Sequence, residues 1–331
     1  MKNKRFLLSM AVSIFVLLLV VLLSLLLGDL RLSFGDLADA LFGKREGISF
    51  NILMYSRLPR TLASLLAGAA LALSGAVLQN VLANKLASPS IIGVNAGAGL
   101  GVTLSCALGV FSGWAVSAFA FGGSLLAVLI ISLFAAKTSA SKTTVILGGV
   151  ALNSILNALS ESLSVLDPDV AMLSAEFRVG GFSSVSYQRL FPAMIMILLA
   201  ALLLFTLCNE LDVISLGDES ARSVGLSTKK YRILFLLLAS LLAGAAVSFS
   251  GLLGFVGLIV PHFARRLVGN ESRFLLPFST VTGAAFVSAC ELVSRLLFSP
   301  YELPVGILMS MIGGPVFVIL LVKMKGGRRH A

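Results

Sequence analysis

Long runs of residues without a single charge are the feature that most restricts how this chain can fold. A helix needs about 20 apolar residues to cross the ~30 Å hydrocarbon layer of a bilayer. Only 12% of the residues are charged, against about 25% in a typical soluble domain, so lipid must solvate much of the surface. The sequence therefore predicts an all-α integral membrane protein. The charge-free runs are 6–28, 61–84, 86–136, 143–160, 190–209, 233–264, 274–290 and 303–322.

Two of these runs are too long for a single crossing. The run 86–136 must fold back on itself, and Gly109 and Gly113 mark the expected turn. In 233–264, the segment 250–254 (SGLLG) and Pro261 are expected to break the helix and to leave a short half-helix as the second piece. The sequence thus predicts ten membrane segments, which places both termini on the same side.

The distribution of charges indicates which side that is. With both termini in the cytoplasm, most of the 25 lysines and arginines lie in inner segments and most of the 15 acidic residues in outer ones, as the positive-inside rule requires. The first run follows Lys2, Lys4 and Arg5 and exceeds the ~7–15 apolar residues of a signal peptide, so we expect an uncleaved first helix. The net charge of +10 is scattered and forms no stripe, which argues against nucleic acid as a partner.

An internal repeat indicates how the segments are arranged. Residues 62–75 (LASLLAGAALALSG) recur as 238–251 (LASLLAGAAVSFSG), although membrane helices favour such residues in general. An odd number of segments separates the two copies, so they cross in opposite directions. We expect helices 2–5 and 7–10 to form an inverted repeat, an arrangement widespread among transporters. The expected parts of one membrane domain (1–331) are helix 1 (about 6–28), repeat one (about 57–168), helix 6 (about 190–209), an inner loop (about 210–232) and repeat two (about 233–323).

The sequence contains none of the motifs on which catalysis would rest. It has no nucleotide-binding G-x-x-x-x-G-K-[ST] loop, no H-E-x-x-H and no G-x-S-x-G. Cys106, Cys208 and Cys290 lie far apart, and the two histidines are His262 and His330, so neither a metal site nor a bound cofactor is predicted. The chain is therefore expected to be a transport subunit and not an enzyme. If ATP drives transport, a separate subunit must hydrolyse it.

Six segments resemble permeases of the FecCD type, which serve ABC importers of iron–siderophores, haem and cobalamin. The resemblance implies the type II ABC importer permease fold, with ten helices in each of two permease subunits (a homo- or heterodimer). It also implies two cytoplasmic ATP-binding subunits, an extracytoplasmic substrate-binding protein and a place in a prokaryotic plasma membrane. The matching segments are 57–60 (RLPR), 75–79 (GAVLQ), 86–94 (LASPSIIGV), 254–265 (GFVGLIVPHFAR), 301–306 (YELPVG) and 312–317 (IGGPVF).

The resemblance assigns a role to three arginines on the outer side. Arg57 and Arg60 are expected at the outer end of helix 2, and Arg295 at the outer end of helix 9. In the family, arginines at such positions meet acidic residues of the binding protein, and guanidinium groups suit this because they pair bidentately with carboxylates. Two structural alternatives stay open: Arg295 pairs with Glu291 four residues earlier, or Arg57 extends along the helix toward the interface.

On the inner side, the pattern Glu219-x-Ala221-x-x-x-Gly225 resembles the segment with which ABC permeases insert a short helix into an ATPase cleft. The residues themselves favour such a helix, since Asp218 and Glu219 suit its positive end and Gly225 its termination. An ordinary amphipathic loop helix is the alternative. The residues expected to couple to the ATPase are Gly217, Asp218, Glu219, Ala221, Arg222 and Gly225.

The sequence indicates the translocation path less directly, through three polar residues of the fifth helix. Asn153, Asn157 and Glu161 are spaced at i, i+4 and i+8, so they share one face of the fifth helix. Polar groups at membrane depth face protein or water, and this face therefore either lines the path or joins helices by hydrogen bonds.

The cargo that best fits these features is an iron(III)–siderophore, taken up by alternating access that ATP hydrolysis in another subunit drives. Cobalamin, haem or an oxyanion could pass through the same machinery. An ion-driven secondary transporter would also contain an inverted repeat. It would need buried acidic residues for H⁺ or Na⁺, and only Glu161 and Glu291 approach that description, both toward the outer side.

Overall fold

The computed structural model describes residues 2–28, 30, 32–43, 47–138 and 142–326, and over these ranges it contains helices and no β-strand. Seven helical segments there are long and apolar enough to cross a membrane, and α5 and part of α15 are shorter apolar helices. The helices that correspond to the ten predicted segments are α1 (Lys2–Leu26), α4 (Leu58–Val81), α5 (Val94–Ala107), α6 (Gly113–Thr138), α7 (Lys142–Leu166), α9 (Tyr187–Thr206), α12 (Thr228–Ser250), α13 (Val256–Val268), α14 (Ser272–Leu297) and α15 (Val305–Gly326).

The breaks expected near Gly109 and within 250–254 are confirmed. Helix α5 ends at Ala107 and α6 begins at Gly113, with Gly109 between them at a φ of 70°. Helix α12 ends at Ser250, and its last turn is closed by Gly251 at a φ of 66°, a conformation in which glycine carries no Cβ penalty. The short half-helix after this break is α13.

Pro261 does not break the chain where the sequence predicted, because α13 continues through it to Val268. A proline inside a helix leaves the carbonyl four residues earlier without its usual donor. Here that carbonyl belongs to Gly257 and accepts a hydrogen bond from Nε2 of Gln79 at 3.1 Å. Because a side chain from α4 donates a hydrogen bond to this carbonyl oxygen, the proline leaves no unsatisfied backbone acceptor there, and the helix can continue.

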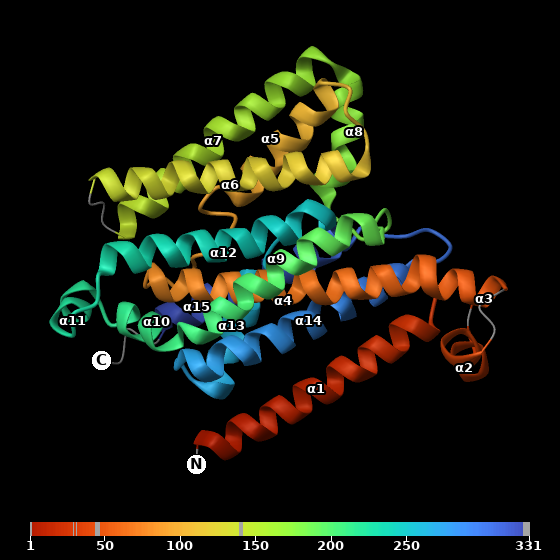
Figure 1. The fold of residues 1–331 in the computed structure, drawn as a ribbon, viewed down its shortest axis with the longest axis horizontal. Coiled ribbons are helices and arrows are strands. Elements are labelled where there is room, and N and C mark those ends of the chain that lie inside the picture. Colours follow the sequence, from red (N-terminus) through yellow and green to blue (C-terminus); the bar gives the residue numbers. More distant parts are fainter. Residues whose placement is uncertain (1, 29, 31, 44–46, 139–141, 327–331) are drawn as a thin grey trace.

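Packing between the helices follows the inverted repeat. Helix α4 packs along α14 as α12 packs along α6, while α5 packs on α6 as α13 packs on α14 (Figure 1). Small residues allow the close approaches at equivalent places. Gly68 of α4 faces Gly283 of α14, and its repeat equivalent Gly244 faces Ser124 of α6. The two copies therefore use the same surface of their first helix to bind the third helix of the other copy.

Short helices gather at the two ends of the bundle. The start of α1 lies at the same end as α10 and α11, whereas α2 and α3 lie at the opposite end (Figure 1). The charge distribution assigns α10 and α11 to the inside, so we name these the inner and the outer end. The short elements are α2 (Phe34–Phe42), α3 (Ile48–Asn51), η1 (Ile52–Arg57), α8 (Pro168–Val179), α10 (Cys208–Ser215) and α11 (Asp218–Ser223).

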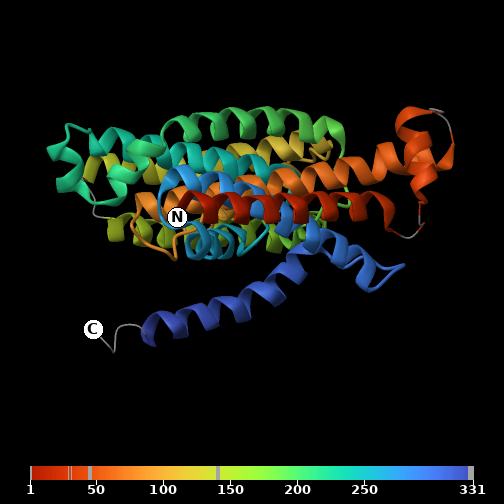
Figure 2. The same cartoon turned by 90° about the horizontal axis from the view of Figure 1, so that it is seen from below.

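Helix α15 stands apart from the rest of the bundle (Figure 2). It contacts α8, α13 and α14, and only along a small part of its length. Large apolar side chains such as Met311 and Val318 are exposed on it. Its surface is therefore available to lipid or to another subunit.

Candidate functional site

A cluster of charged side chains occupies the outer end of α4 and α14. Arg60 donates two hydrogen bonds to the carboxylate of Glu302, at 2.7 and 3.0 Å, and its Nε lies 3.2 Å from Oε1 of Glu291. Glu291 also lies 3.7 Å from Arg295, its neighbour four residues along α14. Glu291 is fully buried and neither of its oxygens accepts a hydrogen bond within the described residues. The two arginines therefore provide the charge that holds this carboxylate in the interior.

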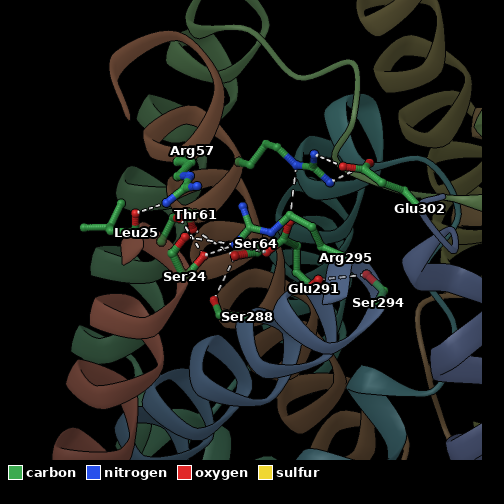
Figure 3. A network of polar contacts seen from close by, with 11 residues as sticks. Ser24, Leu25, Arg57, Thr61, Ser64, Ser288, Glu291, Ser294, Arg295 and Glu302 are labelled. Atoms are coloured by element: carbon green, nitrogen blue, oxygen red, sulfur yellow. Dashed lines mark hydrogen bonds and ion pairs between the residues drawn. The ribbon is translucent and has the colours of Figure 1, made fainter. Parts of the chain in front are cut away.

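Arg57 and Arg295 direct their guanidinium groups into the protein rather than away from it (Figure 3). Arg57 donates to the carbonyl oxygen of Leu25 at 2.6 Å and to that of Leu30. Arg295 donates to the carbonyl oxygen of Ser24 at 2.9 Å. Both arginines thus tie the end of α1 to the helices of the two repeats, and the alternative of a pair between Arg295 and Glu291 is confirmed.

All three predicted docking arginines nevertheless line one outer cavity of 200 Å³, together with Glu302. A larger cavity of 440 Å³ shares Arg60 and Glu302 with it and extends beneath the turn of Gly180 and Gly181 toward α12. Its lining is mostly apolar, from α5, α8 and the start of α15. The structure therefore brings the arginines together at an opening on the outer surface, although in a more buried arrangement than the sequence alone indicated.

The predicted coupling segment forms a short helix at the inner end. Helix α11 begins at Asp218 and is closed by the hydrogen bond from the Leu226 N–H to the Ala221 carbonyl at 2.9 Å, with Gly225 at a φ of 81°. Arg232 donates to both oxygens of Asp218, at 2.6 and 2.7 Å, and this hydrogen bonding is the main reason why the pKa of Asp218 lies below its ordinary value.

Within α11, Asp218 and Ala221 face the protein and the other residues face outward. Ala221 is buried, which holds the helix against α10 and α12. The side chains that the helix offers to a partner are those of Leu216, Glu219, Ser220, Arg222, Ser223 and Val224, all of them exposed.

A network of polar side chains near the inner end was not anticipated from the sequence. Arg265 of α13 donates to the amide oxygens of Gln79 and Asn80 on α4. Asn80 donates to the hydroxyl of Ser272 at 3.2 Å, and the backbone N–H of Ser272 donates to the carboxylate of Asp212 at 2.9 Å. Asp212 thus caps the first turn of α14, and the network connects α10, which leads into α11, with α4, α13 and α14.

The three residues predicted for the path do not behave alike. Asn153 is partly buried and donates to the carbonyl oxygens of Ser90 and Ile91, at 2.8 and 3.2 Å, so it joins α7 to the turn before α5. Asn157 and Glu161 are exposed on the same face of α7. Of the three, Asn153 therefore has the helix-joining role, while the other two are open to lipid, water or a neighbouring subunit.

Two polar contacts in the outer half, made by Glu302 and by Arg178, were not singled out from the sequence. Glu302 stands inside the segment 301–306 that carries the family resemblance, but its partner Arg60 is 242 residues away. Arg178 donates to the hydroxyls of Ser160 and Ser164, at 2.9 and 3.2 Å, and fixes α8 on α7. The presence of an arginine in α8, an outer segment whose other charges are acidic, was the only sequence signal for the second contact.

Comparison with known proteins shows the family to which this architecture belongs. The FecCD transport family matches residues 16–323. The vitamin B12 import system permease protein BtuC of Salmonella typhi is 36% identical over 327 residues, which cover 97% of this chain and 96% of that protein. The uncharacterized ABC transporter permease protein YvrB of Bacillus subtilis is 35% identical over 293 residues, which cover 86% of this chain and 83% of that protein.

Two solved structures have a similar fold. An ABC transporter of the metal-chelate type, in an inward-facing conformation, superposes with a TM-score of 0.85 at 30% identity, covering 95% of this chain and 98% of that one. PsaBC from Streptococcus pneumoniae, in complex with Fab, gives a TM-score of 0.57 at 17% identity, covering 82% and 92% of the two chains, and supports the fold alone. Together with the family match, these relatives confirm the type II ABC importer permease fold. The chain is a multi-pass membrane protein of the FecCD transport family, the permease subunit of an ABC importer that works with ATP-binding subunits and a permease partner.

Proposed function

We propose that this permease carries a bulky metal chelate, with cobalamin as the first candidate. The observation that carries the proposal is the 36% identity to a vitamin B12 import permease over 97% of the chain. The sequence alone favoured an iron(III)–siderophore, and the likeness to a transporter of the metal-chelate type keeps that cargo as the second candidate. We place the protein in a prokaryotic plasma membrane with both termini in the cytoplasm.

Cargo is tested in liposomes that contain this chain, its permease partner if that is a different chain, and the ATP-binding subunits encoded beside it. Each candidate binding protein is added outside with radiolabelled cobalamin or a radiolabelled iron–siderophore. We expect accumulation of cobalamin that requires both ATP and the binding protein. Uptake of the siderophore alone would select the second candidate, and ATP-independent uptake of either would contradict the importer mechanism.

The proposal includes a division of labour along the chain. The exposed residues of α11 enter a cleft of the ATP-binding subunit, which fits their position at the inner end and the firm anchoring of the helix through Asp218 and Ala221. The exposed face of α7 with Asn157 and Glu161, and the exposed α15, face the partner permease and the path between the subunits. A large chelate suits a path of this kind because it needs no ring of charges to replace a hydration shell.

Docking of the binding protein is proposed at the outer cavity that Arg57, Arg60 and Arg295 share. Of these, Arg60 is the residue whose partner an incoming carboxylate could replace, because its hydrogen bonds to Glu302 lie at the cavity wall. Glu302 then acts as an internal competitor for the arginine. Arg57 and Arg295 contribute positive potential from below rather than direct contacts.

Glu302→Gln is expected to strengthen binding of the substrate-binding protein several-fold, whereas Arg60→Gln weakens it by about ten-fold, equivalent to ~1.4 kcal/mol. The first variant frees the guanidinium group of Arg60 to pair with a carboxylate of the binding protein, and the second removes that group. Affinity is measured for the detergent-purified complex at low and moderate salt, and thermal unfolding of each variant confirms that it is folded. If Glu302→Gln and Arg60→Gln shift the affinity in the same direction, the docking assignment is wrong.

A further inference from the structure

A groove lies in the outer half of the bundle, between α6, α9 and α12, and it shares Ser117, Arg189 and Ser248 with the 440 Å³ outer cavity. It has a volume of 180 Å³ and is lined almost entirely by apolar groups, among them Trp114, Phe121, Pro192 and Met196. Neighbouring side chains on these helices, such as Leu126 of α6 and Leu198 of α9, are exposed apolar residues. The polar end of the groove, with Ser117 and Arg189, therefore adjoins the outer cavity, while its apolar end lies among helices that carry exposed apolar side chains.

A cation without a protein partner stands at the top of this groove. Arg189, in the first turn of α9, packs directly against Gly113, the first residue of α6. In the part of the chain that the structure describes, the guanidinium group of Arg189 makes no ion pair or hydrogen bond, and only its backbone N–H donates, to the carbonyl oxygen of Ser186 at 3.1 Å. Glu176 lines the same 440 Å³ cavity but is not paired with Arg189. Two helix N-termini, each with a positive end, and a guanidinium group thus converge on one point. This combination favours an anion.

A buried hydroxyl without a partner lies one helical turn deeper. Ser117 is 8% exposed, and its Oγ has no hydrogen-bond partner among the described residues. It lines the groove between Arg189 above and Phe121 below. On α6, four residues advance about 6 Å, so the groove offers in order a cation, a hydrogen-bond donor and an apolar channel.

We propose that the groove binds one phospholipid of the outer leaflet and prefers an anionic headgroup. The phosphate lies against Arg189 and the start of α6, the ester group accepts a hydrogen bond from Ser117, and an acyl chain runs along Phe121, Pro192 and Met196 toward the membrane centre. The order of groups in a glycerophospholipid matches the order of side chains down the groove.

Trp114 makes the site directly observable, because it is the single tryptophan of the chain and lies on the groove wall. The purified full-length chain is placed in phosphatidylcholine vesicles that contain a small fraction of either brominated phosphatidylglycerol or brominated phosphatidylcholine, whose bromines quench tryptophan fluorescence on contact. We expect the brominated phosphatidylglycerol to bind with about five-fold higher relative affinity, the effect of one arginine near an anionic lipid. Arg189→Gln should abolish this preference, while quenching by brominated phosphatidylcholine stays the same and shows that the groove is intact.

Two control variants sharpen the result. Arg189→Lys keeps the charge and should keep the preference, and Arg222→Gln removes a charge from the inner end and should leave it unchanged. Equal quenching by both lipids in the unaltered chain would overturn the proposal, as would a preference that survives Arg189→Gln. Relief of quenching by millimolar inorganic phosphate would also overturn it, because the site would then bind a free anion and not a lipid.

Discussion

Glu291→Gln is expected to lower the free energy of unfolding by about 3–5 kcal/mol, the cost of removing one partner from a buried ion pair. Glu291 is 0% exposed and lies between Arg60 and Arg295. A neutral amide in its place leaves Arg295 in the interior without its nearby negative charge. Thermal or denaturant unfolding of the purified chain in detergent measures the effect.

Glu302→Gln is the matched control for this prediction. Glu302 pairs with the same Arg60, at 2.7 Å, but its side chain is 33% exposed. Water compensates for the loss of a pair at such a position, so we expect a change of about 1 kcal/mol or less. Equal destabilisation by the two variants would contradict the view that burial of Glu291, and not the number of charges in the cluster, makes the outer end of α14 stable.

Gly75→Ala is expected to prevent close packing of the two repeats and to destabilise the fold by about 3 kcal/mol or more, at or above the upper end of overpacking costs. A Cβ on Gly75 would overlap the carbonyl group and Cα of Gly257, and both are backbone atoms that no rotamer change moves. The same carbonyl accepts the hydrogen bond from Gln79 that compensates for Pro261. Fluorescence-detected size exclusion after heating reports the fraction that remains folded.

Gly122→Ala provides the comparison, because a Cβ at Gly122 of α6 would meet no atom within 4 Å. Alanine is favoured over glycine in a helix by up to about 1 kcal/mol, so this variant should be neutral or slightly more stable. A loss of stability as large as that of Gly75→Ala would mean that the cost arises from glycine replacement in general and not from the contact between α4 and α13.

The helix arrangement could be predicted from the sequence because the features that determine it lie in short, continuous segments. Charge-free runs marked the crossings, and the glycines near 109 and 251 marked where two of them turn. The repeated 14-residue segment predicted the exchange of contacts between the copies, since Gly68 and Gly244 carry the same packing requirement. Pro261 shows the limit of such reasoning: whether a proline breaks a helix depends on a distant donor, here Gln79.

The orientation of the outer arginines was not accessible in the same way. Arg57 and Arg295 are held by carbonyl oxygens at the end of α1, and backbone acceptors leave no mark in a sequence. Likewise, nothing in the spacing of Asn153, Asn157 and Glu161 distinguishes the first residue, which is bound to the turn at Ser90 and Ile91, from the other two. Side-chain types predicted where polar groups gather, but not which of them would already be satisfied within the chain.

The cap that Asp212 forms on α14 determines where this molecule can bend. Through Ser272 and Asn80 it links α10 to the inner ends of α14 and α4, and Arg265 adds α13. We therefore expect a displacement applied at α11 to pass through α10 to these three helices. For α13 we expect the pivot in the non-helical stretch 251–255 that precedes it, where no continuous ladder of helix hydrogen bonds resists rotation. A cross-link across this stretch should then immobilise the transporter while leaving its contacts with nucleotide-binding partners unchanged.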